Sequence, residues 1–179
     1  DGSTRMLCAK CAAVGMPRAV VLTKLDHARS DYAATLAACQ EAFGANVLPL
    51  YLPVVDSAGA TTGLIGMLSG RLFDYGGGTR QESDASPDDA DRLEAARGEL
   101  IEGIIEESED EGLMDRYLGG EEIEQKVLID DLEQAVAKGS FHPVIPVCAT
   151  TGLGTAELLE IVTSAFPSPI EHPMPEVTS

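Results

Sequence analysis

Short apolar runs alternate with amphipathic stretches in the first third of the chain. Residues 18–23 centre on four consecutive apolar residues, rich in β-branched valine, and predict a buried strand. A predicted helix begins near Ser30 and ends at Gly44, because apolar side chains recur there at spacings of three and four. A second strand is predicted over residues 47–52, where Pro49 favours an edge or a bulge. This alternation is typical of an α/β fold with a parallel sheet.

The pattern changes after Pro53. Residues 54–85 are rich in Gly, Ser and Thr, and two short strand candidates there suggest a small antiparallel element. Residues 86–138 predict helices instead, and the first of them has Ser86 at its N-cap and acidic residues in its first turn. The predicted elements are strands over residues 63–69 and 71–75 and helices over residues 87–107, 111–118 and 121–138. This α+β segment interrupts the α/β pattern.

Strand character returns at residues 144–148, and a helix capped by Thr155 is predicted to follow. Its inward face is expected to carry Leu158, Leu159 and Val162. Because one parallel sheet needs strands from both ends of the chain, the α+β segment between them is predicted to be an insertion. The expected division is residues 1–53 with 143–167 as one unit, residues 54–142 as the insertion, and the proline-rich residues 168–179 as a linker toward a following domain.

Composition narrows the function classes. The net charge is −18, from 30 acidic and 12 basic residues, so the chain is a poor autonomous binder of nucleic acid or of an anionic membrane and could attract a basic partner. Aromatic residues make up only 4 %, which predicts an aliphatic core. No signal peptide and no membrane-length apolar run is present, and the four cysteines form no disulfide pattern, so we expect a reduced, cytoplasmic setting. The start at Asp1 without Met suggests a fragment of a longer protein.

Candidate chemistry begins at the end of the first predicted strand. Lys24 and Asp26 lie there, where ligands of open α/β sheets bind. The lysine stem can lie along a planar ring, and the carboxylate can accept two parallel N–H donors such as those of guanine. The alternative is a merely solvated strand end. A second loop, residues 148–154, has small residues whose backbone N–H groups can approach a ligand carbonyl, although an ordinary strand-to-helix turn would look the same.

These two loops carry a resemblance to GTP-binding proteins. The segment Thr23-Lys24-Leu25-Asp26 resembles their Asn-Lys-x-Asp guanine-specificity motif, and Cys148-Ala149-Thr150 resembles their fifth motif, usually Ser-Ala-x. Over residues 1–175 the chain resembles elongation factor G and its bacterial elongation-factor-G-like relatives. The other segments that carry this resemblance are Pro17-Arg18, Leu52-Pro53, Tyr117-Leu118-Gly119-Gly120-Glu121-Glu122 and Phe166-Pro167-Ser168-Pro169.

The resemblance implies an α/β fold of a particular kind. It is a partial P-loop-type G domain, a parallel sheet with flanking helices, that carries an α+β insertion called the G′ subdomain. Residues 1–53 and 143–167 would be the second half of the GTP-binding domain, and residues 54–142 the G′ subdomain. The intact protein would be a ribosome-associated GTPase of protein synthesis.

The resemblance also implies roles in a base pocket. Asp26 would pair with the guanine N1–H and amine, Lys24 would pack along the base and ribose, and the Ala149 N–H would face O6. The guanine-binding candidates are Thr23, Lys24, Asp26, Cys148, Ala149 and Thr150. Thr23 and Cys148 depart from the usual Asn and Ser. The implied ligand is GTP or GDP, held here by base contacts only, and Mg²⁺ is implied for the intact factor without ligands in this chain.

The sequence holds no Gly-x-x-x-x-Gly-Lys-Ser/Thr stretch to cradle phosphates. Asp56 and Gly59 match an Asp-x-x-Gly switch pattern, but they follow the base-recognition strand and so stand in the wrong order. We therefore expect no catalytic residues here, and GTP hydrolysis only by the intact factor. The chain alone is expected neither to hydrolyse GTP nor to bind it tightly.

The acidic helix predicted at 87–107 is the other candidate surface. Its exposed acids include Asp91, Glu94, Glu99, Glu102 and Glu106. The resemblance implies that this helix meets a basic domain of the ribosomal stalk protein, whereas the plainer interpretation is a solvated face. The alternative is a different function class, an acidic protein–protein interaction module without nucleotide function.

A Cys-x-x-Cys pair, Cys8 and Cys11, lies in a predicted helix over residues 3–14. A zinc site needs further paired ligands, and a thioredoxin-like site needs a preceding strand. We expect buried or incidental cysteines and no metal site, with a redox or zinc protein as the alternative.

Overall fold

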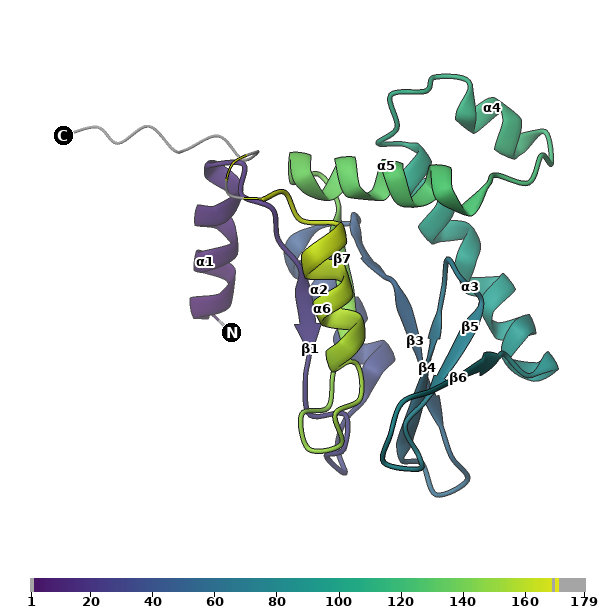
Figure 1. Cartoon of the computed structure of the whole chain (residues 1–179). Helices are drawn as coiled ribbons and strands as arrows, with labels where there is room; N and C mark the ends of the chain where they lie inside the picture. The colour runs from purple at the N-terminus through teal and green to yellow at the C-terminus, as the bar shows by residue number, and fades with distance from the viewer. Residues whose placement is uncertain (1, 169, 171–179) are drawn as a thin grey trace.

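The computed structural model describes residues 2–168 and 170, and this part of the chain holds two β-sheets with helices around them (Figure 1). The first sheet is parallel, with the strand order β1-β7-β2, and the second is antiparallel, with the order β3-β4-β5-β6. The strands are β1 (Val20–Leu22), β2 (Val47–Pro49), β3 (Tyr51–Val55), β4 (Thr61–Gly66), β5 (Arg71–Asp74), β6 (Gln81–Asp84) and β7 (His142–Pro146). Most of the predicted linker, residues 168–179, lies outside the described residues.

The helices divide between the two sheets. In Figure 1, α2 and α6 flank the parallel sheet, α3 lies beside the antiparallel sheet, and α5 runs across the end of both. The helices are α1 (Gly2–Ala13), α2 (Tyr32–Phe43), α3 (Pro87–Ile105), α4 (Leu113–Leu118), α5 (Gln125–Lys138) and α6 (Thr155–Ser164). None of the described helices is both long and apolar enough to cross a membrane.

Local sequence explains where several helices begin and end. The Asp31 side chain accepts a hydrogen bond from the Ala34 N–H (2.9 Å) and caps α2. Ser86 does the same for the Asp89 N–H (3.2 Å) at α3, which has Pro87 in its first turn, as predicted. Gly139 ends α5 in the left-handed conformation that favours glycine.

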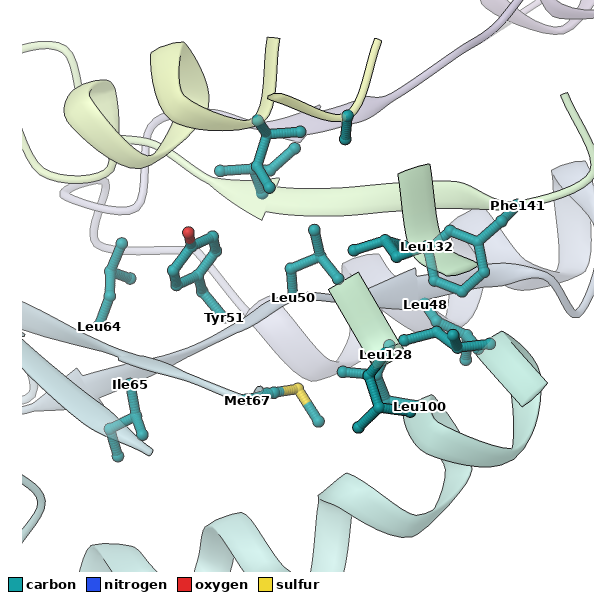
Figure 2. Close-up of a cluster of buried hydrophobic side chains, with 14 of the residues drawn as sticks. Leu48, Leu50, Tyr51, Leu64, Ile65, Met67, Leu100, Leu128, Leu132 and Phe141 are labelled. Atoms are coloured by element: carbon teal, nitrogen blue, oxygen red, sulfur yellow. The ribbon is translucent and has the colours of Figure 1, made fainter. Parts of the chain in front are cut away.

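A mostly aliphatic core joins the two sheets (Figure 2). Leu48 and Leu50, from the chain where β2 gives way to β3, pack in the same cluster as Leu64 of β4 and Leu128 of α5. The opposite face of the parallel sheet forms a smaller cluster against α2, around Val144. Because side chains alternate along a strand, β7 contributes to both clusters.

One predicted strand is divided between the two sheets. Residues 47–52 were expected to form a single strand, but β2 ends at Pro49 and β3 begins at Tyr51. Leu50 explains the division, because its N–H donates to the Val144 carbonyl in the parallel sheet (3.1 Å). Its carbonyl accepts from the Met67 N–H, beside the antiparallel sheet (2.9 Å). The antiparallel sheet is also larger than expected, with β3 and β6 at its edges.

The inward face of α6 was predicted wrongly. Leu159 is 60 % exposed and Val162 is 49 % exposed, whereas Leu158 packs against the core as expected. The buried residues of the helix are Glu157 and Ile161, which lie four positions apart and so share a face. The N-cap is Gly154, with no side-chain cap, so Thr155 is the first helical residue rather than the cap.

The Cys-x-x-Cys pair lies in α1, as predicted. Cys8 and Cys11 are free and half-buried rather than buried, and Arg18 donates to the Cys8 carbonyl (3.2 Å). Among the described residues no group of three or more His, Cys, Asp or Glu side chains is arranged to hold a metal ion.

Candidate functional site

The two candidate loops leave the parallel sheet at the same edge. Strand β1 pairs with β7 in parallel, with Val21 opposite Ile145. The pairing continues beyond the strands, because the Val147 N–H donates to the Leu22 carbonyl (2.8 Å). Loops that follow neighbouring parallel strands therefore emerge side by side, at the carboxyl edge where such sheets bind ligands.

The loop after β1 is held by its own backbone. Lys24 has a φ of 62°, and no other non-glycine residue in the described chain has a positive φ. A lysine in this left-handed region carries a modest conformational cost, of the kind that collects at ligand sites. Leu25 is buried, its carbonyl accepts from the Ser30 hydroxyl (2.9 Å), and the Lys24 and Asp26 side chains flank it in solvent.

A side-chain hydrogen bond joins the two loops. The Thr150 hydroxyl donates to Asp26 Oδ2 (2.8 Å), and the Cys148 thiol lies 3.0 Å from the same hydroxyl oxygen. The Thr150 hydrogen bond lowers the pKa of Asp26 and so stabilises the ionised form of the carboxylate. One carboxylate oxygen is thus engaged by the protein, while the group as a whole remains exposed.

The second loop is closed by its backbone. The Cys148 N–H donates to the Leu153 carbonyl (2.8 Å), and Gly152 and Gly154 both adopt a φ of 76°. Ala149 and Thr150 are exposed at the tip. Within the described residues the Ala149 N–H has no hydrogen-bond partner, so it is free to donate to a ligand.

Thr23, like Lys24 and Ala149, makes no hydrogen bond to the linked groups within the described residues. Its side chain is exposed and makes no hydrogen bond within the described residues. The structure therefore brings together Asp26, Cys148 and Thr150, with Lys24 and Ala149 at the surface of the same two loops. The roles of all six in base binding stay predictions.

Comparison with known proteins identifies the family. A family model described as the elongation factor Tu GTP binding domain matches residues 1–168. The chain belongs to this family. Its resemblance to elongation-factor-G-like proteins and its α/β fold, with a parallel sheet flanked by helices, are both confirmed.

Similar proteins were found both by sequence and by structure. Two proteins named elongation factor G-like protein, from Mycobacterium tuberculosis strains CDC 1551 / Oshkosh and ATCC 25618 / H37Rv, are each 61 % identical over 177 residues. These matches cover 99 % of this chain and 24 % of each relative. A crystal structure from Thermus thermophilus matches with a TM-score of 0.78 and 35 % identity, over 91 % of this chain and 24 % of that one. The chain thus spans about a quarter of the length of these relatives.

Because the chain belongs to a GTP-binding family, we compare the site with the chemistry of a guanine nucleotide. The free N–H of Ala149 and the ionised Asp26 carboxylate suit the edge of a guanine base. Mg²⁺ is implied by the family for the intact factor.

The Asp-x-x-Gly match has a structural role in this family member. The Asp56 carboxylate accepts hydrogen bonds from the N–H groups of Ala58 and Ala60 (2.8 and 2.9 Å). Gly59 supplies a positive φ in the same turn, between β3 and β4. The Asp-x-x-Gly pattern therefore forms a tight turn between two strands of the antiparallel sheet.

The acidic surface of α3 lies away from these loops. Its helix buries an apolar face that includes Leu93, Leu100 and Ile104, as predicted from their spacing. All five candidate acids are exposed, and none forms an ion pair within the described chain: Asp91, Glu94, Glu99, Glu102 and Glu106. These acids are therefore available to an external basic partner.

Proposed function

We propose that this chain supplies guanine-base recognition to the GTP-binding domain of an elongation-factor-G-like translational GTPase. The observation that supports this is the hydrogen bond from Thr150 to Asp26, because it joins the two loops that the base would contact. The Asp26 carboxylate accepts the N1–H and the amine of guanine, the Ala149 N–H donates to O6, and the Lys24 stem covers the ring. Adenine has neither of the two donors that face Asp26, so it would leave the carboxylate unpaired.

The domain assignment belongs to the same proposal. Residues 1–53 and 143–167 form the second half of the GTP-binding domain, and residues 54–142 form the G′ subdomain. The antiparallel sheet and helices α3, α4 and α5 support this division, since nearly all of them fall within the inserted segment. GTP hydrolysis, a Mg²⁺ requirement and work on the ribosome are assigned to the complete factor.

The base preference can be measured on this chain by following its backbone amides during titration with guanosine and adenosine. We expect the amides of Lys24, Asp26 and Ala149 to shift with guanosine, and weaker binding of adenosine, because adenine offers no N–H donors to the Asp26 carboxylate. In Asp26→Asn, the side-chain amide donates where guanine also donates. We expect this variant to lose affinity for guanosine and to gain affinity for xanthosine, which has a carbonyl in place of the exocyclic amine of guanine.

Asp88→Asn is the control, because it removes the same charge from an exposed position on α3. Equal binding of guanosine and adenosine by the unmodified chain would overturn the proposed function. Retention of guanosine preference by Asp26→Asn would overturn the role of Asp26 alone.

A second function is favoured by the five exposed acids of α3, none of which forms an ion pair in the described residues. We propose that this surface binds a basic domain of the ribosomal stalk protein, through charge complementarity that mainly raises the association rate. Titration with such a domain is expected to show binding that weakens from about 10 mM to about 150 mM salt, as the Debye length falls from about 30 Å to about 8 Å. Glu102→Gln should weaken it, whereas Glu41→Gln, on the exposed face of α2, should not. Absence of binding at both salt concentrations would contradict the proposal.

A further inference from the structure

A buried carboxylate lies in the first turn of α6, directly after the second candidate loop. Glu157 has no exposed surface, although it is charged and stands on a short helix. Its Oε2 accepts a hydrogen bond from the Tyr75 hydroxyl (2.6 Å), and its Oε1 accepts one from Arg80 Nε (2.8 Å). Both partners come from the connection between β5 and β6, so this carboxylate ties the antiparallel sheet to α6. We call these three residues the Glu157 cluster.

The cluster is held firmly on the side of the antiparallel sheet. The Arg80 guanidinium lies over the Phe73 ring, 4.3 Å from its centroid, and Phe73 is itself buried in the core. Arg80 Nη2 also lies 3.5 Å from Glu160 Oε1, one turn further along α6. Burial and the bond to Glu157 raise the pKa of Tyr75, so its hydroxyl remains a donor at neutral pH.

The other side of the cluster reaches the loop that carries Ala149 and Thr150. Glu157 lies three residues after Gly154, the left-handed residue at which the loop ends and α6 begins. Gly154 packs directly against the Pro146 carbonyl, where β7 ends. The loop therefore has its first end fixed by β7 and its last end fixed by Gly154 and the cluster. The Thr150 hydroxyl, which donates to Asp26, lies between these two fixed points.

An apolar contact could hold α6 against the sheet at lower cost, because burying charged groups requires their desolvation. Hydrogen bonds to a carboxylate differ from apolar packing in fixing direction and distance. That property matters where a backbone N–H and a hydroxyl have to meet a planar ligand within a few tenths of an ångström.

We propose that Tyr75, Arg80 and Glu157 are positioning residues for the guanine-recognition loop at 148–154, so that the antiparallel sheet helps to set the affinity for the base. This inference rests on the proposed function. None of the three residues touches the base. They act through Gly154 and the first turn of α6, which determine where Ala149 and Thr150 stand.

Tyr75→Phe is the sharpest test, because it keeps the ring and removes only the hydroxyl. Arg80→Gln removes the charged partner, and Arg80→Lys restores the charge. Arg71→Gln is the matched control, since Arg71 pairs with Glu82 (3.0 Å) and with Asp84 across β5 and β6 but does not reach α6. We expect guanosine affinity to fall about threefold to tenfold in Tyr75→Phe and Arg80→Gln, to recover in part in Arg80→Lys, and to be unchanged in Arg71→Gln.

Amide hydrogen exchange supplies a readout that needs no ligand. The Cys148 N–H is bonded to the Leu153 carbonyl, so its exchange should be faster in Tyr75→Phe than in Arg71→Gln at equal free energy of unfolding. Unchanged affinity together with unchanged exchange at Cys148 in a folded Tyr75→Phe chain would overturn the inference. If the unmodified chain failed to bind guanosine, the proposed function would fall. The exchange rates would then decide whether the cluster positions the loop.

Discussion

Gly154 is the residue at which the backbone of the candidate site has least freedom. Its φ of 76° lies in the left-handed region, and a Cβ placed there would overlap the Pro146 carbonyl oxygen. We expect Gly154→Ala to lower the free energy of unfolding by about 2–4 kcal/mol. This combines a cost of about 1–2 kcal/mol for the backbone conformation with at least as much for the overlap. Urea unfolding measures the loss.

Gly152 provides the comparison for that prediction. It has the same φ of 76°, but a Cβ there would meet nothing within 4 Å. Gly152→Ala should therefore lose only the conformational part, about 1–2 kcal/mol. Equal losses in the two variants would show that the contact with Pro146 relaxes without cost.

His142 makes the stability of the fold depend on pH. It is buried at the start of β7, its Nδ1 has no hydrogen-bond partner in the described structure, and burial together with the nearby Arg18 lowers its pKa. The unfolded chain takes up a proton near its ordinary pKa of 6.5, while the folded chain resists it. Stability from this residue is thus complete above that value and is lost as the pH falls through it.

We expect the free energy of unfolding to decline from about pH 7.5 to about pH 5.5 by more in the unmodified chain than in His142→Gln. His27→Gln, in an exposed loop, should retain the decline. Urea titrations at both pH values give the comparison, and parallel declines in the unmodified chain and His142→Gln would contradict the assignment.

The residues of the candidate site could be named from the sequence, but their contact could not. Lys24 and Asp26 follow an apolar run in a recognisable motif, and that signal is local. The bond from Thr150 to Asp26 joins positions 124 apart, and it depends on the register between β1 and β7. Likewise, nothing near Lys24 in sequence indicates its positive φ.

At the scale of elements, helices with a clear apolar stripe were predicted well. The stripe of α3 is made of Leu, Ile and charged residues at helical spacing, and the structure buries the expected side. The face of α6 was predicted wrongly, because the structure buries Glu157 on the inward side and leaves Leu159 and Val162 exposed. The partners of Glu157, Tyr75 and Arg80, lie in the connection between β5 and β6, far away in sequence. A buried charge cannot be inferred from a helix alone when its compensation is supplied from elsewhere.

The division of the strand at Leu50 has the same origin. The run of apolar residues at 47–52 contains no turn signal, and Pro49 is the only break in it. The N–H of Leu50 donates to the parallel sheet, and its carbonyl accepts a hydrogen bond beside the antiparallel sheet. These two partners determine where one strand ends and the next begins. Strand boundaries of this kind follow from the partners of a backbone group rather than from side-chain pattern.

For the whole molecule, the α/β class followed from the order of elements, because alternation of strands and helices is visible locally. The packing of the two sheets against one another was not visible. A single aliphatic core runs from Ile145 of the parallel sheet to Leu64 of the antiparallel sheet, and helix α5 covers both through Leu128 and Leu132 (Figure 2). The two sheets therefore share the side chains that stabilise them.

The pairing of β2 with β7 carries a consequence for how such a protein could arise. These strands are neighbours and parallel, with Val47 opposite His142. Residues 50–141 are therefore, in topological terms, one greatly extended crossover between adjacent strands, a role that a dozen residues and one helix usually fill. A lineage could gain or shed such a segment without changing the order of strands in the sheet. A short connection at this point would still leave both candidate loops at the same edge of the sheet.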